Sequence, residues 1–188
     1  MAGLPSAYFD ALYDRDADPW RFATSAYEAG KYAATLAALP RCRYDSALEI
    51  GCSIGVLTAA LAPRCGALLA TDVAEAALAK ARARNVANPQ VRFARHRFPD
   101  PVPGSDFDLV LLSEVLYYLD KPALVTAAAA IRALTVPGAQ VMLVHWLGPT
   151  PDYPLTGDEA ADGFIAALAA QRLVQSRAVD YRIDLLQL

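Results

Sequence analysis

The sequence has no apolar run close to the roughly 20 residues that span a bilayer, and its first residues lack the basic and then apolar pattern of a secretory signal. Its three cysteines show no CxxC spacing, and with only two histidines they make neither a convincing disulfide set nor a zinc site. A basic surplus is also missing, because 17 Lys and Arg stand against 20 Asp and Glu, a net charge of −3. We therefore expect a cytoplasmic protein with no membrane, metal or nucleic-acid partner.

Apolar residues are plentiful instead. Hydrophobic residues make up 55% of the 188 residues and charged residues 20%. This composition suits one folded domain with a well-buried interior and argues against disorder. We expect a single domain in which residues 1–44 form an N-terminal arm and helix and residues 45–188 form the core.

The most informative stretch is an acid and two glycines in Leu48-Glu49-Ile50-Gly51-Cys52-Ser53-Ile54-Gly55. The apolar residues before Gly51 predict a buried strand, and residues 56–62 have the apolar spacing of a helix. A glycine directly after a strand can turn at positive φ, and its missing Cβ leaves bare backbone for a ligand. The stretch predicts a nucleotide-type pocket at the carboxyl end of a strand, where open α/β sheets bind ligands.

The spacing and charge of this loop bear on which nucleotide it binds. A dinucleotide fingerprint has the pattern Gly-x-Gly-x-x-Gly, whereas here Ser53 stands between Gly51 and Gly55 and the pattern is Gly-x-x-x-Gly. Glu49 precedes the first glycine by two residues, where a carboxylate would repel a phosphate but suit a cationic or hydroxyl-rich ligand. This points away from NAD and towards S-adenosylmethionine, which carries a sulfonium and an amino-acid tail.

A second acid stands where the next strand ends. Residues 67–71 predict that strand, and Asp72 follows it directly. Its distance from Gly51 is about that of an acid that accepts hydrogen bonds from ribose hydroxyls. An adenosine nucleoside and NAD both have such hydroxyls, so Asp72 strengthens the prediction of a pocket without choosing between them.

The remaining pattern alternates strands with helices. Proline and glycine mark the boundaries, and the expected strands lie near residues 47–50, 67–71, 90–94, 107–112 and 139–145, with helices near 56–62, 74–86 and 121–134. A helix is expected from residue 156 or 158 to about 172. Residues 173–188 predict either one long strand or two strands that turn near 179–181, and we favour two. The alternation predicts a parallel sheet with helices on both faces.

The arm before the first strand is mixed aromatic and acidic. Ser25 with Glu28 three residues later forms a capping-box pattern, which predicts a helix over residues 26–39, and Pro19 places a loop or single turn before it. The arm either lies as a lid over the pocket or is a packing helix with a frayed start. Both alternatives stay open.

These motifs together resemble the class I S-adenosylmethionine-dependent methyltransferases. The resemblance lies in the glycine loop, Thr71-Asp72-Val73, Phe107-Asp108-Leu109-Val110 and Val136-Pro137-Gly138. More narrowly, Ser113-Glu114-Val115-Leu116-Tyr117-Tyr118-Leu119, Asp18-Pro19-Trp20-Arg21 and Tyr27-Glu28 resemble the nodulation protein S methyltransferases. The resemblance implies a Rossmann-like α/β fold with a mostly parallel seven-stranded sheet, S-adenosylmethionine as cofactor and an amino-sugar-like acceptor.

The resemblance also implies residues that line the cofactor. Cys52 and Ser113 fall among its matched positions, and Ser53 stands where the class usually has glycine. The class often has an acid after the third strand to hold the adenine, but Arg97 stands there and cannot accept a hydrogen bond. Adenine would then rest on backbone near Phe98 and on Val73. For the carboxylate tail, the candidates are Trp20, Arg21 and Lys31, with Arg21 preferred for its bidentate guanidinium.

Candidate catalytic residues follow the fourth and fifth strands. Methyl transfer needs a neutral nucleophile in line with the methyl group, so an ammonium or hydroxyl acceptor calls for a group that takes a proton. Glu114, His145, Tyr117 and Tyr118 are the candidates. Each also has a structural explanation, as a helix cap, a rim residue or packing tyrosines.

We therefore expect an S-adenosylmethionine-dependent methyltransferase acting on N or O of a small polar acceptor, such as an amino sugar or another saccharide. Two alternatives stay open. One is a module that binds the cofactor without catalysis. The other is an NAD-dependent oxidoreductase, which the spacing of the glycines in the loop disfavours.

Overall fold

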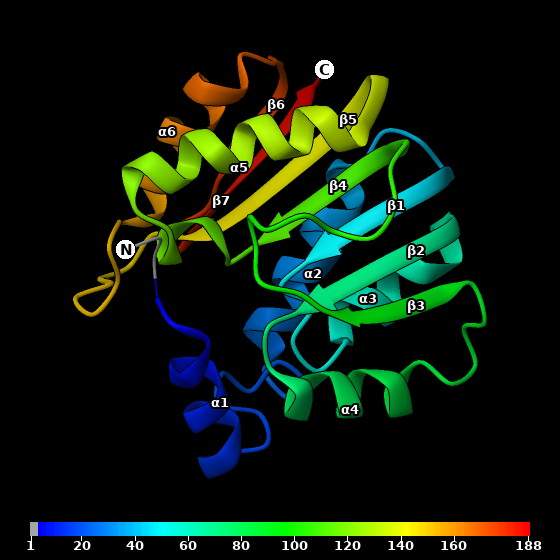
Figure 1. Cartoon of the computed structure of the whole chain (residues 1–188), viewed down its shortest axis with the longest axis vertical. Helices are drawn as coiled ribbons and strands as arrows, with labels where there is room; N and C mark the ends of the chain where they lie inside the picture. Colours follow the sequence, from blue (N-terminus) through cyan, green and yellow to red (C-terminus); the bar gives the residue numbers. More distant parts are fainter. Residues whose placement is uncertain (1–3) are drawn as a thin grey trace. The chain divides into compact units, whose positions relative to one another are not determined.

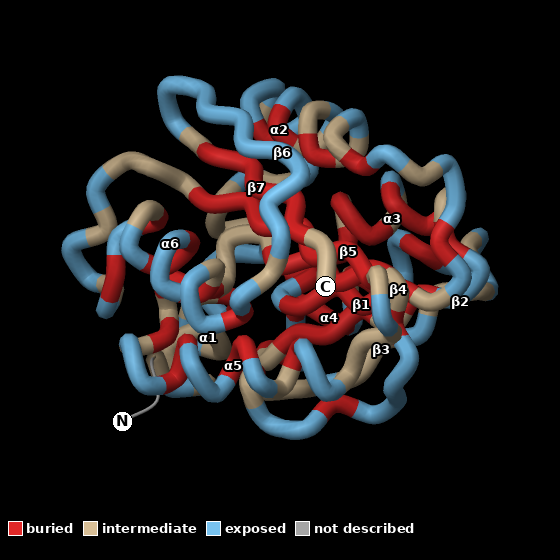
Figure 2. The backbone as a smooth tube through the Cα atoms, turned by 90° about the horizontal axis from the view of Figure 1, so that it is seen from above, coloured by how far each residue is buried: buried red, intermediate tan, exposed pale blue. Residues whose placement is uncertain are grey.

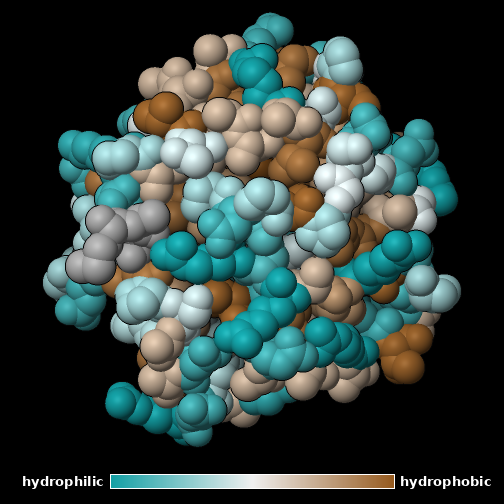
Figure 3. Space-filling view, in the orientation of Figure 1, coloured by the Kyte–Doolittle hydropathy of each residue, from teal (hydrophilic) through white to brown (hydrophobic). Residues whose placement is uncertain are grey.

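The computed structural model describes residues 4–188, which divide into two compact units. We call Pro5–Arg97 the N-terminal unit and Phe98–Leu188 the C-terminal unit; Leu4 belongs to the second, where its N–H donates to the carbonyl of Tyr118. Within the described residues, no helix combines the length and the apolar character of a membrane span. The face in Figure 3 shows polar residues interspersed with apolar ones.

The N-terminal unit contains three parallel strands in the order β3-β2-β1 (Figure 1). Its elements are α1 (Ser6–Arg15), α2 (Ala26–Ala38), β1 (Tyr44–Ile50), α3 (Val56–Leu61), the 3₁₀ turn η1 (Ala62–Arg64), β2 (Cys65–Asp72), α4 (Glu75–Arg84) and β3 (Val91–Arg95). The register pairs Ile50 with Thr71 and Asp72 with Arg95. The strands therefore end together, and the loops that follow them gather at one edge of the sheet.

The C-terminal unit continues with one parallel and two antiparallel pairings. Its elements are β4 (Phe107–Ser113), the 3₁₀ turn η2 (Leu116–Tyr118), α5 (Lys121–Leu134), β5 (Thr135–Trp146), α6 (Gly157–Leu168), β6 (Gln171–Arg177) and β7 (Tyr181–Gln187). Strands β4 and β5 are parallel, whereas β7 runs antiparallel to both β5 and β6. The seven strands form one mixed sheet in the order β3-β2-β1-β4-β5-β7-β6, the Rossmann-like class I methyltransferase fold that the motifs imply.

Burial follows the position of each strand. Residues of β4 and β5 are largely buried, as expected for near-continuous apolar strands, whereas β6 is exposed along its whole length (Figure 2). The two-strand alternative for the C-terminal segment is the one observed, with the turn at residues 178–180 between β6 and β7.

Two expectations about helices need correction. The sequence pattern predicts no helix before residue 26, but Ser6–Arg15 forms the regular helix α1, which buries Tyr13. Helix α6 ends at Leu168 rather than near residue 172. Its end is set by Ala169, which adopts a left-handed conformation with φ of 50°, and by Arg132, whose guanidinium donates to the carbonyl of Leu168. Neither glycine nor proline marks that stop in the sequence.

Helix α2 is anchored at both ends. The Ser25 hydroxyl accepts a hydrogen bond from the Glu28 N–H at 3.4 Å, as the capping pattern predicts. At the other end the guanidinium of Arg64 donates to the carbonyls of Leu36 (2.5 Å) and Leu39 (2.9 Å) and to that of Arg41. A charged donor on these last carbonyls stabilises the helix terminus and fastens α2 to η1.

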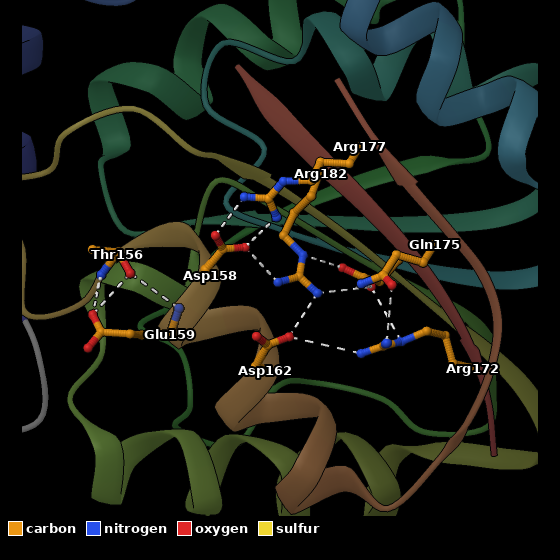
Figure 4. A network of polar contacts seen from close by, with 9 residues as sticks. Thr156, Asp158, Glu159, Asp162, Arg172, Gln175, Arg177 and Arg182 are labelled. Atoms are coloured by element: carbon orange, nitrogen blue, oxygen red, sulfur yellow. Dashed lines mark hydrogen bonds and ion pairs between the residues drawn. The ribbon is translucent and has the colours of Figure 1, made fainter. Parts of the chain in front are cut away.

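An arginine–aspartate cluster joins β6 and β7 to α6 (Figure 4), and it comprises Arg172, Arg177, Arg182, Asp158, Asp162 and Asp184. Arg182 is at its centre, 2% exposed, and donates to Asp184 at 2.8 Å, Asp158 at 2.8 Å and Asp162 at 2.9 Å. Hydrogen bonds from Arg177 and Arg182 lower the pKa of Asp158 to about 2. The buried charges are thus paired, as burial requires.

Replacing Arg182 with Met should lower the free energy of unfolding by about 3–5 kcal/mol, because Asp184, with no exposed surface, would lose its principal partner. The matched control is Arg177→Gln, which removes a half-exposed contact to Asp158 and should cost at most about 1 kcal/mol. Urea denaturation of both variants measures the difference. Equal losses would show that burial does not set the strength of this cluster.

Candidate functional site

The loop after β1 makes a tight turn built on positive φ angles. Gly51 has φ of 77°, Ser53 of 50° and Gly55 of 73°. The N–H groups of Gly51 and Cys52 both donate to the carbonyl of Thr71, at 2.8 and 2.9 Å. This pair of hydrogen bonds turns the chain sharply at the end of the strand, which is the role the sequence assigns to Gly51.

Gly55 is needed for close packing of α3 against α4. A Cβ at this position would lie 2.8 Å from Asn85 Nδ2 and 2.9 Å from the Cα of Ala81. Asn85 instead donates to the Gly55 carbonyl at 3.1 Å, and Arg84 Nε donates to the Ile54 carbonyl at 3.0 Å. Sequence reasoning missed Asn85 and Arg84, since nothing local links the end of α4 to the glycine loop.

Asp72 ties this loop to the end of β2. Its Oδ2 accepts the N–H of Ser53 at 2.8 Å and its Oδ1 accepts the N–H of Ala74 at 2.9 Å. Burial raises the pKa of the Asp72 carboxyl, and the backbone donors oppose that rise. The structure therefore brings together the acid and the loop that the sequence predicts to be neighbours.

Glu49 is a buried carboxyl group beside the same loop, only 2% exposed. Burial raises its pKa to about 8; the Thr58 hydroxyl opposes the rise, and the charge of Asp72 adds to it. Among the described residues, Glu49 Oε2 has no hydrogen-bond partner. A buried acceptor without a donor costs free energy, and a ligand that brings an ammonium or hydroxyl would remove that cost. The residues present thus fit a cofactor with an amino-acid tail.

The arm residues named for the cofactor's carboxylate tail lie in different surroundings. Trp20 is half-buried and stacks on Phe22, with ring centroids 5.5 Å apart. Arg21 is exposed and has φ of 57°. Lys31 is buried and pairs with Glu28 at 3.0 Å, so its charge is already balanced by a neighbour on its own helix. Of the two cations, Arg21 is the one at the surface.

The residues named for the adenine end are less uniform. Val73 is half-buried and accepts a hydrogen bond from Arg95 Nε at 2.9 Å, while Arg97 is half-buried and Phe98 buried. Cys52 is buried, and burial raises the pKa of its thiol well above the ordinary value, so it packs as a neutral group.

Among residues 4–188, no group of three or more His, Cys, Asp or Glu is placed to hold a metal ion.

In the C-terminal unit, β4 ends at the half-buried Ser113, and Glu114 follows it. Glu114 has φ of 59°. Its Oε2 accepts hydrogen bonds from the hydroxyl of Tyr117 at 2.9 Å and from the N–H of Trp146 at 2.8 Å. A non-glycine residue in the left-handed region is unusual, and here two donors fix its side chain. The carboxylate is held in one orientation at the carboxyl ends of two parallel strands.

Three tyrosines pack beside Glu114. Tyr117 stacks on Tyr153 with centroids 5.2 Å apart, and Tyr118 meets both rings edge-on at 4.7 Å. Burial is the main cause that raises the pKa of Tyr117 and Tyr118, so both stay protonated. Tyr153 was missed from the sequence because it lies in the proline-rich loop before α6, far along the chain from the other two.

His145 lies inside the protein rather than at a rim. Its side chain has no exposed surface, and Nε2 accepts the N–H of Leu116 at 3.4 Å. Its ring meets that of Tyr117 edge-on, with centroids 5.7 Å apart. Because Leu116 begins η2, this contact suits a role in positioning the turn that carries Tyr117 and Tyr118.

A family model and curated relatives both match this chain. The family model described as nodulation protein S (NodS) matches residues 10–143. Nodulation protein S of Bradyrhizobium diazoefficiens is 39% identical over 119 residues, which cover 62% of this chain and 56% of the relative. Ubiquinone biosynthesis O-methyltransferase of Pseudomonas aeruginosa is 35% identical over 100 residues, 51% of this chain and 42% of the relative. The matches thus span about half the length of these curated relatives.

A solved structure shares the fold over nearly the whole chain. N-methyltransferase NodS from Bradyrhizobium japonicum WM9, in complex with S-adenosyl-L-homocysteine, has a TM-score of 0.84 at 24% identity and covers 97% of both chains. At that identity the likeness concerns the fold.

Glu49→Gln should stabilise the ligand-free protein at alkaline pH. The unfolded chain loses the Glu49 proton near 4.5, whereas the folded pKa is about 8, so the free energy of unfolding falls as the pH rises between those values. The variant does not titrate there. Urea denaturation at pH 5, 7 and 9 should show its advantage over wild type growing with pH, by up to a few kcal/mol at about 1.4 kcal/mol per pKa unit. A constant difference would contradict the assigned pKa.

Proposed function

The chain belongs to the nodulation protein S family, and from this premise we propose that it is an S-adenosylmethionine-dependent methyltransferase that methylates a nitrogen of a small polar acceptor. The observation that carries the proposal is the glycine loop with positive φ at Gly51, flanked by the buried carboxyl groups of Glu49 and Asp72. Carboxylates at this position suit hydroxyls and an ammonium and would repel a diphosphate.

The cofactor supplies an electrophilic methyl group when bound; the chain's own residues hold and orient it. We assign the ribose hydroxyls to Asp72, whose oxygens already point to the loop through Ser53 and Ala74. We assign the ammonium of the tail to Glu49, because Oε2 has no partner among the described residues. Arg21, exposed on the arm, is the proposed partner of the tail's carboxylate.

Glu114 is the proposed catalytic residue on the acceptor side. An amine acceptor must present a free electron pair, so an ammonium has to lose a proton before it is methylated. The carboxylate of Glu114 can accept that proton and orient the amine, because Tyr117 and Trp146 fix its position. His145 holds η2 through Leu116 and is proposed as a positioning residue.

The tyrosine rings support a saccharide-like acceptor. The faces and edges of Tyr118 and Tyr153, both half-buried, offer an amphipathic surface of the kind that packs against the apolar face of a sugar ring. We therefore propose an amino sugar as the acceptor class. Transfer to oxygen is the second candidate, favoured by the likeness to an O-methyltransferase.

Cofactor choice is tested by isothermal titration with S-adenosylhomocysteine and with NAD. Wild type should bind the first and not the second. Asp72→Ala should weaken that binding by roughly 1–3 kcal/mol, because ribose hydroxyls would be left unpaired. Asp14→Ala, which removes an exposed carboxylate from α1, is the control and should change nothing. Micromolar binding of NAD alone would overturn the assignment of the cofactor.

Acceptor chemistry is tested by following S-adenosylhomocysteine formation with amino sugars, simple amines and small hydroxyl compounds. We expect turnover with amines, and a loss of about a hundredfold in kcat for Glu114→Gln at unchanged cofactor affinity. Turnover with hydroxyl compounds alone would favour O-methylation. Equal losses of turnover and cofactor affinity would place Glu114 at the cofactor instead. No product from any acceptor would indicate a cofactor-binding module.

A further inference from the structure

The proposed function leaves one buried contact of the N-terminal unit unused. Tyr13, the buried residue of α1, shares a hydrogen bond between its hydroxyl and that of Ser53 in the glycine loop. Burial, with the charge of Asp72 adding to it, raises the pKa of Tyr13 well above the ordinary value, so the hydroxyl keeps its proton. The two hydroxyls are 40 residues apart in the sequence, and their contact fastens α1 to the loop.

Ser53 is an unfavourable residue for its backbone. At φ of 50° a side chain is strained, whereas glycine would adopt this conformation without cost. What serine adds is its hydroxyl, and that hydroxyl is bonded to Tyr13. The backbone N–H of the same residue donates to Asp72 Oδ2. Ser53 therefore connects α1 with the acid that we assign to the ribose.

The other contacts of the α1 segment differ in kind. Apolar side chains of the arm pack on the loop and on the start of α4, namely Phe9, Tyr13, Trp20 and Phe22 against Ile54, Val56, Ala74 and Ala77. Polar contacts join Lys80 to the Ala17 carbonyl at 2.9 Å and Arg95 to Asp10 at 3.6 Å, both at exposed positions. The first is a hydrogen bond to backbone and the second an ion pair, and an exposed ion pair contributes little. The buried hydroxyl pair is thus the directional contact that fixes where α1 rests.

We propose that the Tyr13–Ser53 hydrogen bond is a latch that holds α1 against the cofactor-binding loop, so that Tyr13 is a positioning residue that sets how fast the cofactor enters and leaves. The proposal rests on the proposed function, because it places the cofactor at the loop that Ser53 belongs to. The loop can open only when the bond to Tyr13 is broken, and the same event admits the incoming cofactor and releases the spent one.

The test compares Tyr13→Phe, Ser53→Ala and the double variant with wild type. Each single change removes one hydroxyl of the pair. Ser53→Ala also keeps a side chain at the position with left-handed backbone. Stopped-flow tryptophan fluorescence with S-adenosylhomocysteine should show association and dissociation rates both raised about three- to tenfold, the effect of one hydrogen bond. The double variant should show no further increase, because both changes remove the same contact. Asp14→Asn, at an exposed position of the same helix, is the control and should leave both rates unchanged.

A faster association separates a latch from a merely structural contact, whose loss would weaken binding without speeding entry. Unchanged association in both single variants, or additive effects in the double variant, would overturn the proposal. Hydrogen exchange of the amides of α1 gives a readout without ligand, and Tyr13→Phe should speed it three- to tenfold relative to Asp14→Asn. If wild type binds no S-adenosylhomocysteine, the proposed function fails, and this exchange measurement alone decides whether the latch exists.

Discussion

The hydrogen bond from the Ser53 N–H to the Asp72 carboxylate is the contact on which the N-terminal unit depends. It joins the loop after β1 to the end of β2, so two segments that are 19 residues apart keep one geometry. Three other contacts hold the same loop. The Thr71 carbonyl accepts two N–H groups from it, Gly55 packs closely against Asn85, and the Tyr13 hydroxyl is bonded to that of Ser53. Each leaves the loop fewer conformations, and a preorganised loop loses less entropy when a ligand binds.

The C-terminal unit uses the same arrangement at a second pair of strands. Glu114 follows β4 and accepts the N–H of Trp146 at the end of β5, as Asp72 ends β2 and accepts an N–H just beyond β1. In both units a carboxylate bridges the carboxyl ends of two neighbouring parallel strands. This arrangement needs parallel strands, because only then do the carboxyl ends of two adjacent strands lie at the same edge of the sheet. The backbone N–H groups beyond one strand are then within reach of a side chain at the end of the other.

Local patterns predicted most of the fold. Alternating apolar runs, prolines and capping residues placed the strands and most helices, since these depend on neighbours in sequence. Gly51 and Asp72 were found because a strand end followed by glycine or an acid is a local signal. Tyr13, Asn85 and Tyr153 were missed because their roles come from contacts with distant residues. His145 shows the converse: its place at the end of a strand suggested a rim residue, but packing under η2 buries it.

The protonation of Glu49 has a calorimetric consequence. With a pKa of about 8, this carboxyl group carries its proton in much of the ligand-free protein near neutrality. An ammonium that settles beside it favours the charged carboxylate, so the proton passes to the solution. The heat recorded on mixing then includes the ionisation enthalpy of whichever buffer receives that proton. Phosphate and Tris, which differ widely in that enthalpy, would yield different apparent heats for the same association.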